Sequence, residues 1–293
     1  MNVLLRELRD AGRGILSKPG FSAFVIAVLA AGLACVLFMS VLIFGLVVRP
    51  LPFAAPDQLL HIGYSLSDRP DRLSDVNERD VAALQSRLSS VADVAAYQRQ
   101  TINLSDEGRA ERYSGASVSS NLFDVLGVSP QLGRSFTASE GLLGAAPTVM
   151  LSDAIWRQRY NADPSIVGRA VRLNANNATV VGVMPADFSY PQKEVVWTPG
   201  VINADVARAK GSDWVVVARR HADTHSTALM SLLDTWYADM KSEAPRYFED
   251  RAVGVEPLDY QIINRGTRAI LKVLLVAVIL VLLVACANAA NLM

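Results

Sequence analysis

The chain has 293 residues, a formal net charge of zero and 51% hydrophobic residues. A neutral charge balance gives no bulk attraction to nucleic acid, and the length suffices for one or two domains. Cys35 and Cys286 are the only cysteines, which excludes a small secreted scaffold held by disulfides.

The first 20 residues predict an amphipathic helix on the cytoplasmic surface of a membrane. Its apolar positions recur at helical spacing, while Arg6, Arg9 and Arg13 take the opposite side. Pro19-Gly20 is expected to end this helix. A solvated basic tail is the alternative interpretation.

Residues 21–48 contain no charged residue and predict a first membrane-spanning helix. A bilayer core of about 30 Å needs about 20 apolar residues in helical form. The apolar part of a cleaved signal peptide has only about 7–15 residues, so this longer segment is expected to stay in the membrane.

A second apolar run, residues 273–293, predicts a second span, which leaves residues 49–272 as a globular domain between the two. Cys35 and Cys286 are expected at different depths in the bilayer, too far apart for a disulfide. Small residues at spacing i, i+4 let helix backbones approach closely, and amides can hydrogen-bond between helices in lipid. The residues predicted to pack the spans on these grounds are Ala27, Ala31, Ala30, Ala34, Ala285, Ala289, Asn288 and Asn291.

Basic residues flank the spans about equally on both sides, so a simple count does not orient the chain. Long loops cross the membrane largely regardless of their charge, and the short N-terminal tail should therefore govern. The tail is then expected in the cytoplasm and residues 49–272 outside it.

The globular domain mixes helices and short strands without strict βαβ alternation, which predicts an α+β extracytoplasmic domain between two transmembrane α-helices. Asp75 and Glu78 have capping-box spacing within the first expected helix. The expected helices are Ser74–Leu88, Ser120–Gly127, Asp153–Tyr160 and Ser226–Glu243. The expected strands are Leu59–Tyr64, Val91–Tyr97, Thr101–Leu104, Glu111–Ser119, Thr148–Leu151, Ala170–Leu173, Thr179–Met184, Val195–Thr198, Trp214–Ala218 and Ala252–Glu256.

The sequence carries no motif typical of catalysis, cofactor binding or metal binding. The chain has no Gly-x-x-x-x-Gly-Lys-Ser/Thr loop to hold a nucleotide and no nucleophile elbow. His221 and His225 have the spacing of metal ligands on a helix, but the residues between them are typical of a loop and helix cap. We therefore expect no catalytic, cofactor or metal-binding residue in this chain.

Five sequence blocks resemble, in order and spacing, the extracytoplasmic core domain of MacB-type and FtsX-like ABC transporter permeases. The blocks are Gly115–Val128, Leu132–Phe136, Val149–Trp156, Ile166–Arg169 and Val180–Pro185. The closing Leu282–Leu292 resembles the second span of the same family, and the closest likeness is to large permeases with two such repeats. Family members carry further spans after the second, so the resemblance implies that this chain is the N-terminal part of a permease or a truncated gene product.

The resemblance implies a protein of the bacterial inner membrane whose large domain lies in the periplasm. It also implies several partners: a cytoplasmic ABC ATPase that binds the ATP, further permease spans or a second permease copy, the lipid bilayer, and a periplasmic protein or cargo. The implied function is to couple ATP hydrolysis by the partner to movement of the periplasmic domain, for export or mechanotransmission. A two-span sensor with an extracytoplasmic ligand-binding domain is the main alternative, and a membrane-anchored hydrolase is a third.

Overall fold

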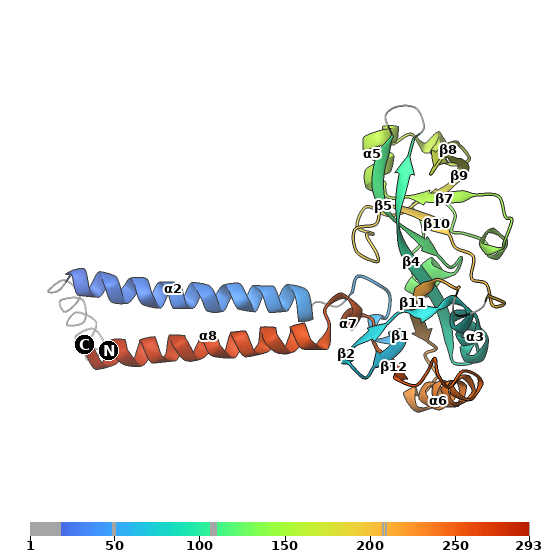
Figure 1. Ribbon diagram of the computed structural model, residues 1–293. Coiled ribbons are helices and arrows are strands. Elements are labelled where there is room, and N and C mark those ends of the chain that lie inside the picture. The colour runs from blue at the N-terminus through green and yellow to red at the C-terminus, as the bar shows by residue number, and fades with distance from the viewer. Residues whose placement is uncertain (1–18, 49–50, 106–109, 207, 209, 293) are drawn as a thin grey trace. The chain divides into compact units, whose positions relative to one another are not determined.

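The computed structural model describes residues 19–48, 51–105, 110–206, 208 and 210–292, and the chain separates into two compact units. The helical unit lies within Met1–Pro50 and Ile263–Met293, and the head comprises Leu51–Ile262 (Figure 1). The predicted surface helix with Arg6, Arg9 and Arg13 lies outside the described residues.

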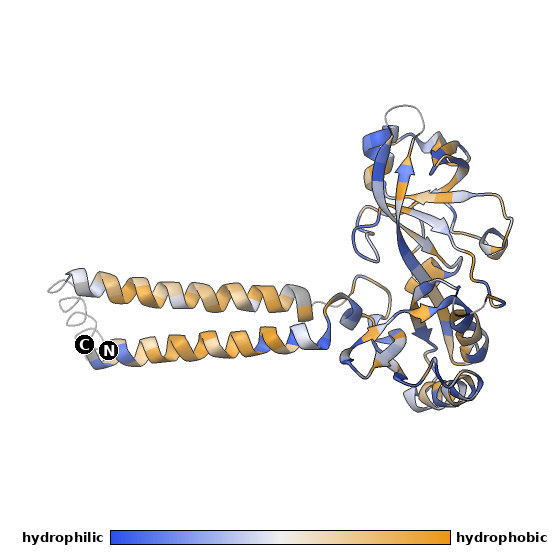
Figure 2. Cartoon of the chain, viewed as in Figure 1, coloured by the Kyte–Doolittle hydropathy of each residue, from blue (hydrophilic) through white to orange (hydrophobic). Residues whose placement is uncertain are grey.

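The helical unit consists of α2 (Pro19–Ile43), which continues as the π-helical turn η1 (Phe44–Val48), and α8 (Arg265–Leu292). The two helices lie side by side and run in opposite directions (Figure 1). Both are long and apolar enough to cross a membrane, over Ser22–Ile43 and Arg265–Asn291, and apolar residues cover most of their surface (Figure 2). α8 begins at Arg265 rather than Val273, because Arg and Lys are good helix formers and extend the helix beyond the apolar run.

The head is built on a twelve-stranded mixed sheet whose main order is β12-β1-β11-β4-β5-β10-β7-β9-β6. The strands are β1 (Leu59–Leu66), β2 (Arg69–Ser74), β3 (Val76–Asn77), β4 (Ala92–Leu104), β5 (Glu111–Val118), β6 (Leu132–Gly133), β7 (Thr148–Leu151), β8 (Ala170–Leu173), β9 (Asn176–Val183), β10 (Val196–Pro199), β11 (Asp213–Arg220) and β12 (Arg251–Pro257). The helices are η2 (Pro56–Gln58), α3 (Glu78–Leu88), α4 (Leu122–Leu126), η3 (Ala138–Gly141), α5 (Asp153–Tyr160), η4 (Pro164–Ile166), α6 (Ser226–Glu243) and α7 (Asp259–Ile262).

One half of the sheet, β12-β1-β11-β4, is covered on both faces. Alternate residues of β11 point to opposite sides, so that Trp214 and Val216 pack in the core cluster of α3 and α6, while Val217 packs in the cluster of α4. A strand buried on both faces needs an unbroken apolar run, and Trp214–Ala218 supplies it.

The other half of the sheet closes into a small barrel. Each neighbour in the series β4-β5-β10-β7-β9-β8 is paired, and β8 returns to β4 through the single pair Leu104–Leu173. Aliphatic side chains such as Ile102, Val149 and Val180 fill the interior, and none of them is exposed.

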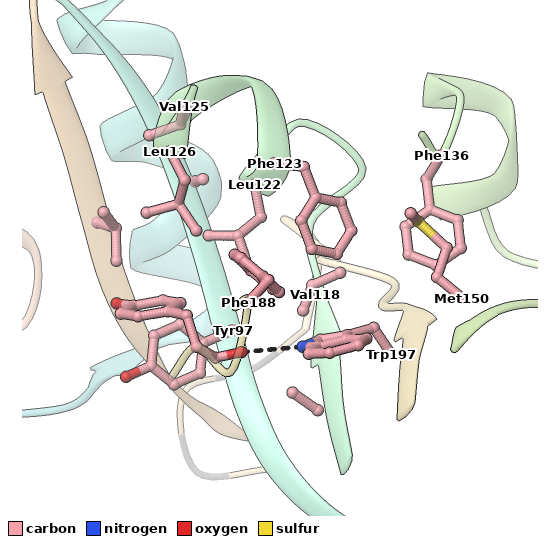
Figure 3. Packing of buried hydrophobic residues seen from close by; sticks show 14 of the residues in the cluster. Tyr97, Val118, Leu122, Phe123, Val125, Leu126, Phe136, Met150, Phe188 and Trp197 are labelled. Carbon is pink, nitrogen blue, oxygen red and sulfur yellow. Dashed lines mark hydrogen bonds between the residues drawn. The ribbon is translucent and has the colours of Figure 1, made fainter. Parts of the chain in front are cut away.

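An aromatic cluster lies where α4 packs against the middle of the sheet (Figure 3). Phe123 contacts Phe188 and Trp197 edge-on, with ring centroids 5.7 and 6.2 Å apart. The Trp197 indole N–H donates to the backbone carbonyl of Tyr190 at 3.0 Å, which ties the loop 185–194 to β10. Burial is the largest cause that raises the pKa of Tyr97, to about 12, so this phenol stays neutral.

The predicted α+β class is confirmed, as are the helices α5 and α6 and the strand β7 at their expected bounds. The predicted helix Ser74–Leu88 is wrong at its start, because residues 69–77 pair as β2 and β3. α3 begins at Glu78, where the side chain of Asn77 accepts the Arg79 N–H and caps the helix. The two strands predicted within 91–104 form one continuous strand, β4.

Candidate functional site

The contact between α2 and α8 follows a regular seam. In each helix the less exposed residues recur at alternating spacings of three and four, which is the pattern of two helices packed along a narrow stripe. In α2 the residues of this seam are Ser22, Val25, Leu29, Gly32, Val36, Met39 and Ile43, and in α8 they are Arg268, Leu271, Leu275, Val278, Leu282, Ala285 and Ala289. Leu42 and Gly266 are also partly buried but lie outside this spacing. At the middle of the seam Gly32 lies so close to Leu282 that a Cβ atom there would be 2.9 Å from Leu282 Cδ1.

The residues predicted to pack the spans divide into two groups. Ala285 and Ala289 lie on the seam of α8, and Ala289 is only 7% exposed. The others lie off this seam and are exposed in this chain: Ala27, Ala30, Ala31, Ala34, Asn288 and Asn291. Their predicted role in helix packing stays a prediction. Gly32, which sequence reasoning missed, is a small residue at the seam.

A charged side chain joins the two helices at one end of the pair. Arg268 is 8% exposed, and its Nε donates to the carbonyl of Ile263 at 2.9 Å. Its Nη1 reaches the carbonyl of Val47 in η1 at 3.4 Å. Carbonyls in the last turn of a helix lack partners within the helix, and a cation with several donors is suited to them. Arg268 therefore fastens the end of α2 to the start of α8.

Within the head, a buried ion pair ties the loop between β10 and β11 to helix α3. The carboxylate of Asp80 is fully buried and accepts from Arg208 Nη2 at 2.8 Å and Nε at 3.0 Å. The Tyr64 hydroxyl donates to the same carboxylate at 2.8 Å. Burial is the largest cause that raises the pKa of Tyr64, with the neighbouring Asp80 charge adding to it. The cluster is fully hydrogen-bonded, which is the condition for a buried charge to be tolerated.

The three histidines lie on different elements: His61 on β1, His221 just after β11 and His225 at the start of α6. His61 is buried on β1, with Nδ1 3.4 Å from the carboxylate of Glu256 on β12. His221 lies 3.4 Å from Asp93, and His225 is exposed at the start of α6. Across the described part of the chain, no three His, Cys, Asp or Glu side chains come together as a metal site.

The head contains a groove of about 1040 Å³ between Leu51–Phe53, β4 and the loop 185–194. Phe53, Phe188 and Tyr190 form its apolar floor, and the Phe53 ring lies edge-on to Tyr190 at 5.5 Å between centroids. Arg99 and Lys193 lie at its rim. Sequence reasoning missed this groove because its walls come from segments far apart in the chain and carry no motif.

Comparison with known proteins gives the family. The sequence profile of the MacB-like periplasmic core domain matches residues 22–233. The periplasmic region of MacB from Actinobacillus actinomycetemcomitans is similar in fold, with a TM-score of 0.50 and 16% identity over 70% of this chain and 90% of that one. The extracellular domain of the noncanonic ABC-type transporter YknZ from Gram-positive bacteria gives a TM-score of 0.48 and 15% identity over 67% of this chain and 99% of that one. Among curated proteins, none matches.

The profile covers well over half of the chain, and the blocks that carry the predicted resemblance lie within it. The match begins within α2 and ends within α6, and the described chain has two helices able to cross a membrane, which is consistent with a protein of the inner membrane. The chain therefore belongs to the family of the MacB-like periplasmic core domain.

Proposed function

We propose that this chain couples ATP hydrolysis by a cytoplasmic partner ATPase to movement of its head on the other side of the inner membrane. The observation that carries the proposal is that a MacB-like core domain is joined at both ends to apolar helices, which pack on each other as one antiparallel pair. A pair held along a continuous seam and fastened by Arg268 moves as one body rather than as two loose tethers. Export of a cargo, or transmission of force to a periplasmic partner, would use this movement.

The proposed topology puts the N-terminus in the cytoplasm and the head in the periplasm. The basic tail predicted to lie on the membrane supports this orientation. The proposed partners are an ABC ATPase, further permease spans or a second permease copy, and a periplasmic protein or cargo. We propose no catalytic or cofactor-binding residue in this chain.

The test is co-purification of the longest natural gene product with the ABC ATPases of the same cell, followed by measurement of ATPase activity in lipid nanodiscs. We expect a specific ATPase to bind, and Gly32→Leu, which separates the helices at the seam, to change its activity while binding persists. Cysteine labelling of the head in spheroplasts tests the orientation separately. Recovery of no ATPase when the ATPases are expressed would refute the proposal, and recovery of a signalling kinase instead would favour the sensor.

A further inference from the structure

The strand β4 has a gap in its pairing on one side. β4 pairs with β5 continuously from Tyr97 to Leu104. On its opposite side it pairs with β11 through Ala92–Tyr97 and with β8 only at Leu104. Among the described residues, the segment 98–103 therefore has no strand partner on that side.

Neighbouring contacts show which backbone groups face the gap. The Asn103 N–H donates to the side-chain oxygen of Asn174 at 2.9 Å, and the Asn103 carbonyl accepts the Asn174 N–H at 2.9 Å, so the backbone of Asn103 points away from β5. Backbone groups alternate in direction along an antiparallel strand. Thr101 and Arg99 therefore also direct their N–H and C=O groups into the gap. Tyr97, the next alternate residue along the strand, uses the same side of β4 to pair with β11.

These same two residues line the groove in the head. Both residues are exposed, and the apolar residues Phe53, Phe188 and Tyr190 line the same groove. An unpaired strand edge beside an apolar pocket is the arrangement by which proteins bind an extended peptide as an additional strand.

The charges at the rim indicate what kind of peptide fits. Arg99, Lys193 and Asp187 are the exposed charged residues of the lining. Glu194 also lines the groove, but its carboxylate is buried and accepts the Gln192 N–H at 2.6 Å, so it is not part of the exposed rim. The exposed rim thus carries one excess positive charge, which complements an acidic side chain.

We propose that the head binds an extended acidic segment of a partner protein, which pairs with Arg99 and Thr101 of β4 as an added strand. Alternate side chains of a strand point to opposite sides, so that an apolar residue of the segment packs on the aromatic floor. The open edge lies between Tyr97, which pairs with β11, and Asn103, which bonds to Asn174, so it takes a segment of about five residues. A lipid chain could fill the apolar floor but would leave the backbone groups of the edge unpaired. This inference does not depend on coupling to an ATPase.

The experiment selects peptides from a displayed library of random nonapeptides against the full chain in lipid nanodiscs, with empty nanodiscs as counter-selection. Enriched peptides are then synthesised with a fluorescent label and titrated by fluorescence anisotropy. Thr101→Pro removes one of the two N–H groups that point into the gap and leaves the β4–β5 pairing intact, as proline does on a strand edge. Thr101→Val keeps this N–H and serves as the matched control. The unfolding midpoint of each variant shows whether it is folded.

We expect enriched peptides that carry an acidic and an apolar residue, and we expect Thr101→Pro to weaken their binding at least tenfold while Thr101→Val changes it less than twofold. N-methylation of alternate peptide nitrogens, which removes donors without touching the protein, should also weaken binding at least tenfold. Equal binding to both variants, or no enrichment over empty nanodiscs, would overturn the proposal. A photoactivatable phosphatidylglycerol gives a second test. If it crosslinks to Phe53 or Phe188 and the library yields no enriched peptide, the proposal is overturned and the groove is assigned to lipid.

Discussion

Asp80→Ala should destabilise the head severely, because it removes one partner of a fully buried ion pair. The substitution leaves the guanidinium of Arg208, whose side chain is only 11% exposed, without the carboxylate that it contacts at 2.8 Å. The Tyr64 hydroxyl loses its acceptor at the same time. Breaking a buried pair in this way typically costs about 3–5 kcal/mol of the free energy of unfolding.

The matched control is Arg87→Ala, which breaks the ion pair of Arg87 with Asp239 between α3 and α6. The two charged groups of this pair are 2.9 Å apart, close to the 2.8 Å of the buried pair, but its side chains are 52% and 49% exposed. An exposed pair contributes at most about 1 kcal/mol, since solvent screens it. The difference between the two variants therefore measures burial rather than the mere presence of a salt bridge.

Urea unfolding of the full chain in detergent micelles measures both effects through tryptophan fluorescence. The four tryptophans, Trp156, Trp197, Trp214 and Trp236, all lie in the head, so the signal reports its unfolding alone. In a double-mutant cycle, Arg208→Met in the Asp80→Ala background should restore part of the loss, because it removes the uncompensated charge. A cost below about 1 kcal/mol for Asp80→Ala would refute the reasoning.

Three further predictions concern the seam, a surface ion pair and a glycine. With Cys35 and Cys286 first changed to Ser, oxidation should crosslink Gly32→Cys with Leu282→Cys, whereas Ala31→Cys with Leu283→Cys, both exposed, should stay uncrosslinked on a gel. The Arg134 guanidinium beside Glu140 holds the pKa of that carboxyl at about 2, so the pair stabilises the head above about pH 4.3, the ordinary pKa of Glu, and this stability is lost as the pH falls toward 2. Glu140→Gln should therefore reduce the loss of unfolding free energy between about pH 4.3 and about pH 2 by about 1 kcal/mol, since the pair is partly screened by solvent. The exposed Glu249→Gln is the control, and a pH dependence of stability that is the same in both variants would contradict this prediction. Gly115→Ala should lower the free energy of unfolding by about 1–3 kcal/mol, because its Cβ would lie 2.4 Å from Ile102 Cδ1 and 2.8 Å from the Val196 carbonyl oxygen. Gly141→Ala, whose Cβ would lie 3.6 Å from its nearest neighbour, the Gly200 carbonyl oxygen, should lower it far less in the same fluorescence assay.

Local chemistry explains why many elements of the head could be predicted from the sequence. Ser152 accepts the Ile155 N–H and begins α5, as its position before an acidic first turn predicts. Gly127 ends α4 in the left-handed conformation that glycine adopts without strain. The start of α3 was predicted wrongly because Asp75 and Glu78 have capping-box spacing, yet pairing with neighbouring strands keeps residues 69–77 extended.

The sequence by itself determined the two apolar helices, the α+β head between them and the family, because hydrophobic runs, caps and short sequence blocks are local in the chain. Only the tertiary structure decided which face of each helix forms the seam, since small residues occur on several faces of α2 and only contact with α8 selects Gly32. The same holds for the Asp80–Arg208 pair, the closure of the barrel by Leu104 and Leu173, and the open edge at Thr101. Each of these features depends on which residues distant in the chain meet, or fail to meet, in the fold, and no local pattern specifies such a pairing.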